Sequence, residues 1–238
     1  MIRLDKLLKD CGLGSRKEVK EYIRKGLVMV NDVVIKNDDY KVDEEKDCIK
    51  FDNEMIMYEK YVYIMLNKPA GVVSATFDNK DRTVLDLIDE YQHMDLFPFG
   101  RLDKDTEGLL IISNDGKLAH DLLSPKKHVD KKYYVEVEGV LTLDDIKAFN
   151  NGITIDEELC KPADLEIIKS DAISNCYVTI CEGKYHQVKR MFESVNKKVI
   201  YLKRITFGNI SLDENLKLGE YRKLTDEEIN ILKRNDLK

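Results

Sequence analysis

The sequence predicts an α+β protein with a small N-terminal α/β unit and a larger domain whose mixed, mostly antiparallel sheet is flanked by helices. The first 58 residues combine short helical and strand-like segments, whereas longer strands alternate with helices from residue 59 to residue 238. The sequence also lacks G-x-x-x-x-G-K and G-x-G-x-x-G, the phosphate-binding motifs of doubly wound parallel sheets. We therefore place the domain boundary between residues 58 and 59.

The N-terminal unit begins with two predicted helices. "RLDKLLKDCG", residues 3–12, carries leucines at helical spacing and a glycine where the helix would end. Ser15 and Glu18 form a capping-box pattern, which predicts a second helix behind them. Two short strands within 26–35, turned at Asn31-Asp32, and a third over 47–51 complete the unit.

The larger domain is predicted from longer periodic segments. Alternating apolar and polar residues indicate strands, and apolar residues three or four apart indicate helices. We expect strands over 61–67, 108–113, 131–139, 164–169, 175–181 and 198–208. We expect helices over 83–91, 117–123, 142–152, 185–195 and 225–234, the last again behind a capping box.

The charge is unevenly distributed along the chain. The net charge is −6, but residues 1–25 hold eight basic and four acidic side chains, whereas residues 32–54 hold four basic and nine acidic ones. Binding of phosphate groups depends on the local charge of the protein surface rather than on the net charge of the whole chain. The acidic composition therefore does not exclude a nucleic-acid partner.

The cysteines and the apolar runs indicate a cellular compartment. The five cysteines are scattered, without a C-x-x-C pair or a histidine at a zinc-ligand spacing, which favours free thiols in a reducing environment. No apolar run has the length of a membrane span, and the N-terminus lacks the apolar centre of a signal peptide. We expect a cytoplasmic protein without membrane contact.

The stretch "GRLDKDTEGLLIISNDG", residues 100–116, places an arginine and three carboxylates directly before an apolar strand. Three interpretations remain open from these residues alone. The Asp and Thr side chains could cap backbone groups. Asp103 and Asp105 could ligate a metal ion, although no third ligand stands at a convincing spacing. One carboxylate could act as a nucleophile or acid/base group held by a cation.

Three further stretches accompany this loop: "LNKPAGVVSAT" at 66–76, "DKKYYVEVEG" at 130–139 and "EGKYHQVKRMF" at 182–192. Together they resemble the pseudouridine synthases that act on ribosomal RNA, in the branch with an N-terminal S4-type RNA-binding domain. The resemblance covers essentially the whole chain, and "GRLDKDTEGL" matches the signature G-R-L-D-x-D-T-x-G-L in full. The small-subunit members are most similar, and the large-subunit members are the nearest alternative.

This resemblance implies an isomerase that detaches uracil from its ribose, turns it and rejoins it through C5. Such a reaction needs a carboxylate beside the sugar, a flat surface for the loosened base and exclusion of water. It involves no net redox change or hydrolysis. We therefore expect no cofactor and no metal.

The resemblance also implies four catalytic residues. Asp103 would add to the sugar or promote glycal formation, and the sequence does not choose between the two routes. Tyr133 would stack on the target base, and Lys189 would pair with the catalytic carboxylate. Arg101 would help to extrude the target or hold a flanking phosphate.

The other residues of the signature are expected to shape the loop. Thr106 and Gly108 would form the turn, while Asp105 and Glu107 would satisfy backbone donors or an arginine.

RNA contacts are implied in both domains. In the N-terminal domain they are Arg3, Ser15, Arg16, Lys17, Lys20 and Arg24. In the catalytic domain they are Lys68, Lys131, His186, Gln187 and Arg190, of which His186 and Gln187 would also order their loop. The acidic stretch 37–47 would face away from RNA or limit which RNA surfaces can dock.

Together, these expectations describe a monomer that modifies ribosomal RNA, with 16S RNA favoured, within a partly assembled small subunit. The favoured target is uridine-516 of 16S RNA, a choice that rests on similarity alone. A synthase for 23S RNA is one alternative. A non-catalytic RNA-binding assembly factor is another, although it predicts damage at Asp103 or Tyr133, and both residues are intact.

Overall fold

The computed structural model describes residues 1–124, 127 and 129–234. The chain divides into two compact units: Met1–Val62 with Asp89–Leu96, and Tyr63–Ile88 with Phe97–Lys238. The division therefore falls four residues after the predicted boundary, and a short later segment joins the first unit. No helix among the described residues combines the length and apolar character that a membrane span requires.

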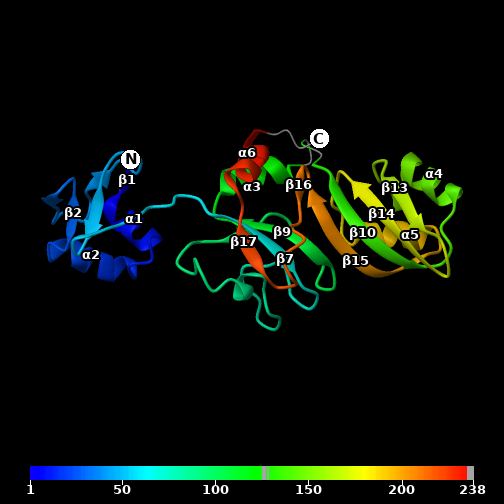
Figure 1. The fold of residues 1–238 in the computed structure, drawn as a ribbon, viewed down its shortest axis with the longest axis horizontal. Coiled ribbons are helices and arrows are strands. Elements are labelled where there is room, and N and C mark those ends of the chain that lie inside the picture. The colour runs from blue at the N-terminus through cyan, green and yellow to red at the C-terminus, as the bar shows by residue number, and fades with distance from the viewer. Residues whose placement is uncertain (125–126, 128, 235–238) are drawn as a thin grey trace. The chain divides into compact units, whose positions relative to one another are not determined.

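The first unit contains helices α1 (Leu4–Asp10) and α2 (Arg16–Arg24), as predicted (Figure 1). The capping box of α2 forms, with the Ser15 N–H donating to Glu18 Oε2 at 2.8 Å. Antiparallel strands lie in the order β3-β2-β5-β6, and β1 pairs separately with β4. The bounds are β1 Ile2–Arg3, β2 Val28–Val30, β3 Val33–Val34, β4 Lys41–Val42, β5 Ile49–Phe51 and β6 Glu54–Met55.

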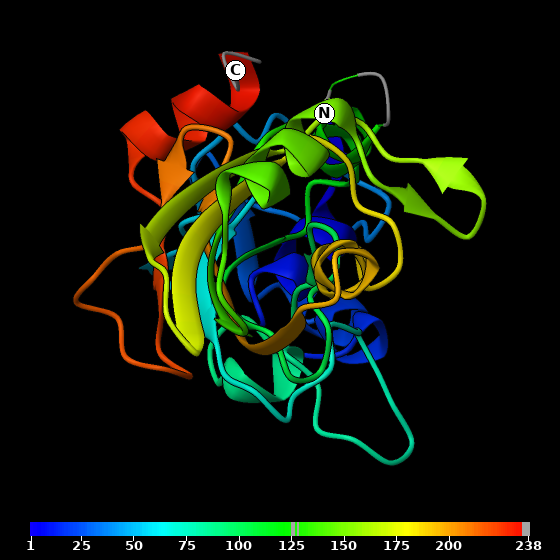
Figure 2. The ribbon, with the colours of Figure 1, turned by 90° about the vertical axis from the view of Figure 1, so that its right-hand side faces the viewer.

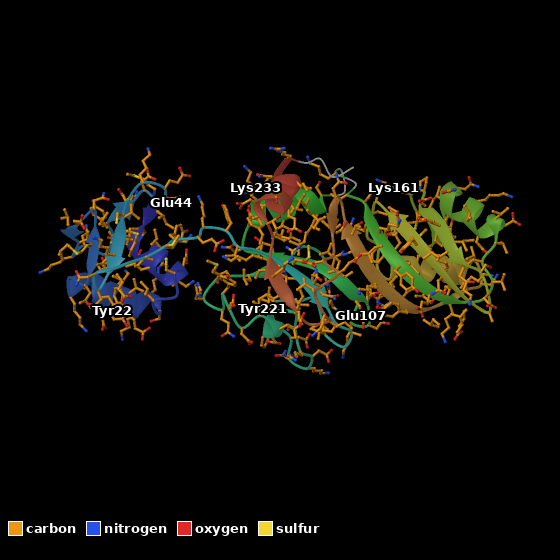
Figure 3. All side chains as sticks on the ribbon, in the orientation of Figure 1. Tyr22, Glu44, Glu107, Lys161, Tyr221 and Lys233 are labelled. Carbon is orange, nitrogen blue, oxygen red and sulfur yellow. The ribbon has the colours of Figure 1, made fainter. Side chains whose placement is uncertain are left out.

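The core of this unit forms where α1 and α2 turn their apolar faces inward. Leu4, Leu7 and Leu8 are fully buried, as are Val19 and Ile23. On the outer side, the Tyr22 ring lies 5.2 Å from that of Phe51, centroid to centroid; Tyr22 is labelled in Figure 3. The leucine spacing read from the sequence is therefore the spacing of a core face.

The second unit is organised by one large curved sheet (Figures 1 and 2). Its main order is β13-β14-β10-β15-β9-β7-β17, with β16 beside β15 and β8 beside β9. Among the described strands, β15 and β9 form the parallel pair and the other neighbours are antiparallel, so the predicted mixed, mostly antiparallel sheet is confirmed. The bounds are β7 Tyr63–Lys68, β8 Phe97–Pro98, β9 Glu107–Ser113, β10 Lys131–Glu138, β13 Asp164–Lys169, β14 Ile173–Ile180, β15 Lys198–Phe207, β16 Ile210–Ser211 and β17 Tyr221–Lys223.

Helices of the second unit are α3 (Gly116–Leu123), α4 (Leu143–Asn151), α5 (Gln187–Ser194) and α6 (Asp226–Arg234), and β11 (Thr154–Ile155) pairs with β12 (Glu158–Leu159). The helix predicted over 83–91 is wrong. Only a 3-10 turn forms, at Leu85–Leu87, where the Asp86 carboxylate accepts the Thr83 N–H at 2.7 Å. That contact is of the capping-box kind and starts the turn, but Ile88 is already extended and Tyr91 has a φ of 60°, so the backbone leaves helical geometry directly after it.

The parallel contact between β9 and β15 explains a glycine of the signature. Gly108, with a φ of 99°, pairs with Arg204 across the two strands. A Cβ at this position would lie 2.2 Å from the Arg204 carbonyl oxygen, so a side chain cannot fit without moving backbone. Gly108 therefore belongs to strand β9 rather than to the turn, and its role is to let β15 approach.

Candidate active site

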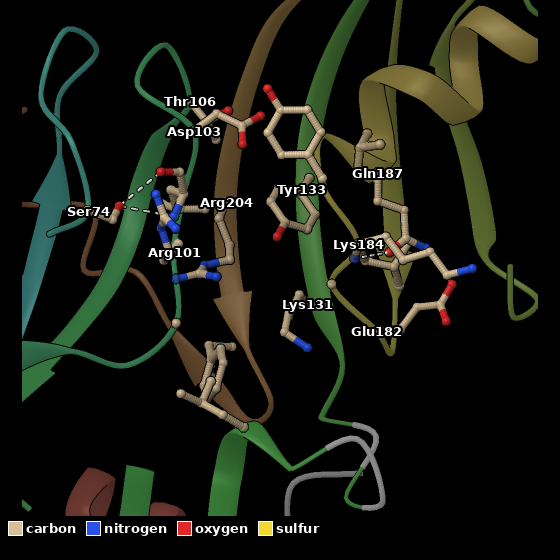
Figure 4. Close-up of a pocket in the computed structure, with 18 of the residues that line it drawn as sticks. Ser74, Arg101, Asp103, Thr106, Lys131, Tyr133, Glu182, Lys184, Gln187 and Arg204 are labelled. Atoms are coloured by element: carbon tan, nitrogen blue, oxygen red, sulfur yellow. Dashed lines mark hydrogen bonds between the residues drawn. The ribbon is translucent and has the colours of Figure 1, made fainter. Parts of the chain in front are cut away.

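A cavity of about 850 Å³ opens in the second unit, where segments distant in sequence meet. Arg101 and Asp103 come from the loop before β9, Tyr133 from β10 and Arg204 from β15 (Figure 4). His186, directly before α5, also lines the cavity. The sheet order explains this convergence, because β10, β15 and β9 are consecutive neighbours. Several of the predicted catalytic residues thus line one cavity.

Lys189 on α5 places a positive charge against the carboxylates of the loop. Its Nζ lies 3.0 Å from Asp103 Oδ2 and 2.6 Å from Asp105 Oδ1. Burial alone would lower the pKa of Lys189, but the hydrogen bonds to Asp105 and Asp103 raise it above its ordinary value. Burial also opposes ionisation of Asp105, yet the Lys189 ammonium lowers the pKa of that carboxyl overall. The ammonium therefore stays charged beside Asp103.

The neighbourhood of Asp103 favours an ion-paired carboxylate over a metal site. Its second oxygen lies 3.6 Å from His186 Nε2, and its side chain keeps a quarter of its exposure. The described residues contain no cluster of three or more His, Cys, Asp or Glu side chains that could hold a metal ion. Of the three interpretations of the loop, the geometry is most consistent with a carboxylate held by a cation.

The segment after β7 holds this loop in place through two buried side chains. Ser74 Oγ donates to the Leu102 carbonyl at 2.9 Å and accepts the Leu102 N–H at 3.0 Å (Figure 4). Lys68 Nζ faces four carbonyl oxygens, those of Thr106 at 2.8 Å, Asp103 at 3.0 Å, Pro69 at 3.1 Å and Lys104 at 3.3 Å. Lys68 has no exposed surface, so its predicted contact with RNA is wrong. Its ammonium instead holds the backbone of the loop that carries Asp103.

Two other signature residues, Asp105 and Glu107, have partners that the sequence did not indicate. Asp105 accepts from Lys189, and Glu107 Oε2 accepts from the Tyr201 hydroxyl at 2.7 Å, so neither meets an arginine. Glu107 is labelled in Figure 3. Thr106 is buried, and its hydroxyl oxygen has no hydrogen-bond partner among the described residues.

The loop before α5 is ordered from within. Gln187 is nearly buried; its side chain accepts the Lys184 N–H at 2.9 Å and donates to Glu182 at 2.6 Å. Arg190 forms an ion pair with Asp156. Gln187 thus has little exposed surface for a contact with RNA. Arg190 could bind an RNA phosphate only by giving up its ion pair with Asp156.

An exposed aromatic residue at the cavity was missed by the sequence analysis. Tyr185 is 76% exposed, lines the cavity, and stacks on the His186 ring with 3.8 Å between centroids. Stacked exposed rings are typical platforms for unpaired bases. The sequence did carry a signal for this residue, since Tyr185 stands beside His186 in a loop that contains Gly183.

Arg204 was also missed. It is 2% exposed, lines the cavity, and donates from Nε to the Leu109 carbonyl at 2.7 Å. Burial lowers the pKa of its guanidinium, an effect that the neighbouring Tyr133 opposes. Strand alternation provided a signal, because Arg204 follows the buried Leu202 by two residues and so shares its face.

Cations of the first unit are largely engaged by carboxylates. Asp5 is fully buried and accepts two hydrogen bonds from Arg3 at 2.9 Å, with Arg16 and Lys20 each 3.8 Å away. The Ser15 hydroxyl accepts the Glu18 N–H and so caps the N-terminus of α2.

The acidic stretch contacts cations of the predicted RNA side at two positions. Asp38 contacts Arg24 at 2.8 Å and Lys20 at 3.7 Å, and Asp39 pairs with Arg3. The alternative that this stretch faces away from the predicted RNA side is wrong for Asp38 and Asp39. The alternative that it limits docking stays a prediction.

Comparisons with known proteins agree on both units. A family described as RNA pseudouridylate synthase matches residues 62–194, and the S4 domain family matches residues 2–48. An uncharacterised RNA pseudouridine synthase of Bacillus subtilis is 47% identical over 97% of this chain and 98% of its own. A Vibrio cholerae protein named ribosomal small subunit pseudouridine synthase A is 43% identical, covering 96% and 98%. A crystal structure titled pseudouridylate synthase aligns with a TM-score of 0.68 and 36% identity, over 98% of this chain and 100% of that one.

Proposed function

Because the chain belongs to the RNA pseudouridylate synthase family, with an S4 domain ahead of the synthase domain, we propose that it converts one uridine of ribosomal RNA into pseudouridine without a cofactor. The observation that carries this proposal is the carboxylate of Asp103. It lines the same cavity as Tyr133 and has the Lys189 ammonium 3.0 Å away.

The chemistry fits these groups. The N1–C1′ bond breaks, the uracil turns, and a C5–C1′ bond forms; C5 loses a proton and N1 gains one, so atoms and electrons balance without an oxidant. Asp103 either adds to the sugar or assists glycal formation, and Lys189 stabilises its carboxylate in both routes. Tyr133, only 7% exposed, offers a ring face for the detached base.

Binding would combine two surfaces. The S4 unit supplies a basic helix whose attraction to phosphates is electrostatic and independent of sequence. The cavity requires the uridine to leave its stack, as in other enzymes that act on a base inside folded nucleic acid. Tyr185 and Arg101, at the exposed part of the cavity, would meet the flipped nucleotide and its neighbours.

The substrate that we favour is uridine-516 of 16S RNA in a partly assembled small subunit. The support is the small-subunit name carried by the Vibrio cholerae relative, which matches this chain over nearly its whole length. A uridine of 23S RNA is the alternative, and the experiment below decides between them.

The test is to incubate the purified protein, without metal or nucleotide, with unmodified 16S RNA, 23S RNA and partly assembled small subunits. Pseudouridines are then mapped at single-nucleotide resolution. We expect one new site, absent with Asp103→Asn. Asp105→Asn is the matched control: it removes the neighbouring charge but leaves the Lys189–Asp103 pair, so product should still form.

Each outcome has a distinct meaning. Product from Asp103→Asn at a comparable rate would remove the central assignment. A site in 23S RNA would correct the substrate while keeping the reaction. RNA binding without any new pseudouridine would favour the non-catalytic alternative.

A further inference from the structure

Two cations on the strands of the cavity wall have no carboxylate partner among the described residues. Arg204 and Lys131 lie on neighbouring strands, β15 and β10, and both pack against the ring of Phe207. The Arg204 guanidinium carbon is 5.5 Å from the ring centroid and Lys131 Nζ is 5.8 Å from it. Figure 4 shows both side chains at the hollow beside Tyr133.

Arg204 has donor capacity that the protein does not use. Its Nε donates to Leu109, but Nη2 is buried and has no hydrogen-bond partner among the described residues. An unpaired buried donor on a charged group costs free energy, so such atoms in native structures call for an explanation. The side chain lines the cavity, which makes a cavity ligand the available partner.

Lys131 is in a similar position. Its Nζ donates to the Val129 carbonyl at 2.7 Å, which satisfies one hydrogen and neutralises no charge. Burial, and then the charge of Arg204, lower the pKa of Lys131 to about 8, and smaller contributions from Cys181, Asp130 and Glu182 oppose this shift. Among the described residues, no carboxylate oxygen lies within 4 Å of either cation.

Two other cations at this cavity are paired, whereas Arg101, which also lacks a carboxylate partner among the described residues, is exposed to solvent. Lys184 Nζ lies 3.0 Å from Glu158, and Lys104 Nζ lies 2.7 Å from Asp81. The lack of a counter-ion is therefore not common to the whole cavity wall, and Arg204 and Lys131 combine it with withdrawal from solvent.

We propose that Arg204 and Lys131 form a subsite for a phosphate group of the RNA segment that enters the cavity. The inference rests on the proposed function, since it takes the ligand to be RNA. A uracil or ribose oxygen could accept one hydrogen bond, but it would leave two like charges uncompensated. The phosphate is the anionic group of RNA, and its oxygens can accept from Nη2 and Nζ together.

The subsite would also position the reaction. A phosphate held on this side of Tyr133 fixes the backbone of the flipped nucleotide next to the ring on which its base would rest. Both the base and the sugar are then constrained relative to Asp103, which is the kind of orientation that accelerates a reaction inside a cavity.

The experiment compares two probes, uridine 3′,5′-bisphosphate and uridine, by chemical-shift titration of the full-length protein. We expect the wild type to bind the bisphosphate at least tenfold more tightly than uridine. Lys131→Met should reduce this ratio at least threefold, and Arg204→Met further. Lys184→Met, which removes a paired cation from the same cavity, is the control and should leave the ratio unchanged.

Two further comparisons between variants distinguish a phosphate contact from a structural role of Arg204. Arg204→Lys keeps a charge and should restore part of the ratio that Arg204→Met loses. If Arg204→Met does not fold by circular dichroism, Lys131→Met still provides the test, because its side chain is less buried.

The outcomes do not depend on turnover. A ratio that stays unchanged in Lys131→Met, or no detectable binding of the bisphosphate at millimolar concentration, overturns the subsite even if pseudouridine forms. A protein that prefers the bisphosphate over uridine but forms no pseudouridine would support the subsite and refute the proposed function.

Discussion

Lys68→Met tests how the loop that carries Asp103 is held. Methionine retains most of the length and apolar volume of the side chain but removes the ammonium, which lies within 3.3 Å of four carbonyl oxygens. Two of these oxygens keep a backbone donor: Asp103 accepts from Thr106, and Lys104 accepts from Gly71. The carbonyls of Pro69 and Thr106 are the ones that lose a partner.

The magnitude follows from these two carbonyls. Leaving a buried acceptor unpaired costs about 1–3 kcal/mol, which applies in full to the Thr106 carbonyl; the Pro69 carbonyl is only part-buried, so the variant should lose about 1–4 kcal/mol of unfolding free energy. Turnover should fall as well, because the freed loop carries Asp103. A displacement of about 1 Å at a reacting group can reduce the rate about 100-fold.

Urea unfolding and single-turnover pseudouridine formation are the assays. Lys104→Met is the control for stability: Lys104 belongs to the same loop but is exposed and paired with Asp81, so its loss should cost at most about 1 kcal/mol. A Lys68→Met protein with wild-type stability and turnover within twofold would refute the positioning role.

Three further predictions follow from other contacts. Gly108→Ala should destabilise the protein by about 3 kcal/mol or more, since its Cβ would meet the Arg204 carbonyl; urea unfolding checks this against Gly183→Ala, which has open space and should cost under about 1 kcal/mol. Asp38→Asn should strengthen RNA binding up to about fivefold at low salt and steepen its salt dependence, because Lys20 and Arg24 are released; weaker binding in a filter assay at two salt concentrations would contradict this. Burial lowers the pKa of Lys68 from 10.5 to about 8 in the folded protein. Between pH 8 and pH 10.5 the unfolded chain therefore binds more protons than the folded one, so the free energy of unfolding rises with pH. Relative to Lys68→Met, the wild type should gain at most about 3 kcal/mol over this range. Denaturation curves at three pH values check that direction.

Local patterns in the sequence determined most of the elements. The Ser15–Glu18 capping box and the Asn31-Asp32 turn depend on hydrogen bonds and backbone angles within a few residues, and both form as predicted. The same kind of pattern failed at 83–91, where the contacts between Thr83 and Asp86 start a 3-10 turn but the backbone is already extended at Ile88. The signature loop pointed to Asp103 only through its resemblance to a family motif, because its residue types and spacing alone left three interpretations open.

Partners across the sheet were decided only by the tertiary structure. Lys68 reads as a surface cation until the fold brings the loop 35 residues later over its ammonium. Lys189 meets Asp105 across 84 positions of sequence, and Arg204 reaches the cavity because β15 pairs with both β9 and β10. Whether a charged side chain is solvated, paired or left facing a cavity depends on which distant segment covers it, and no local periodicity carries that information.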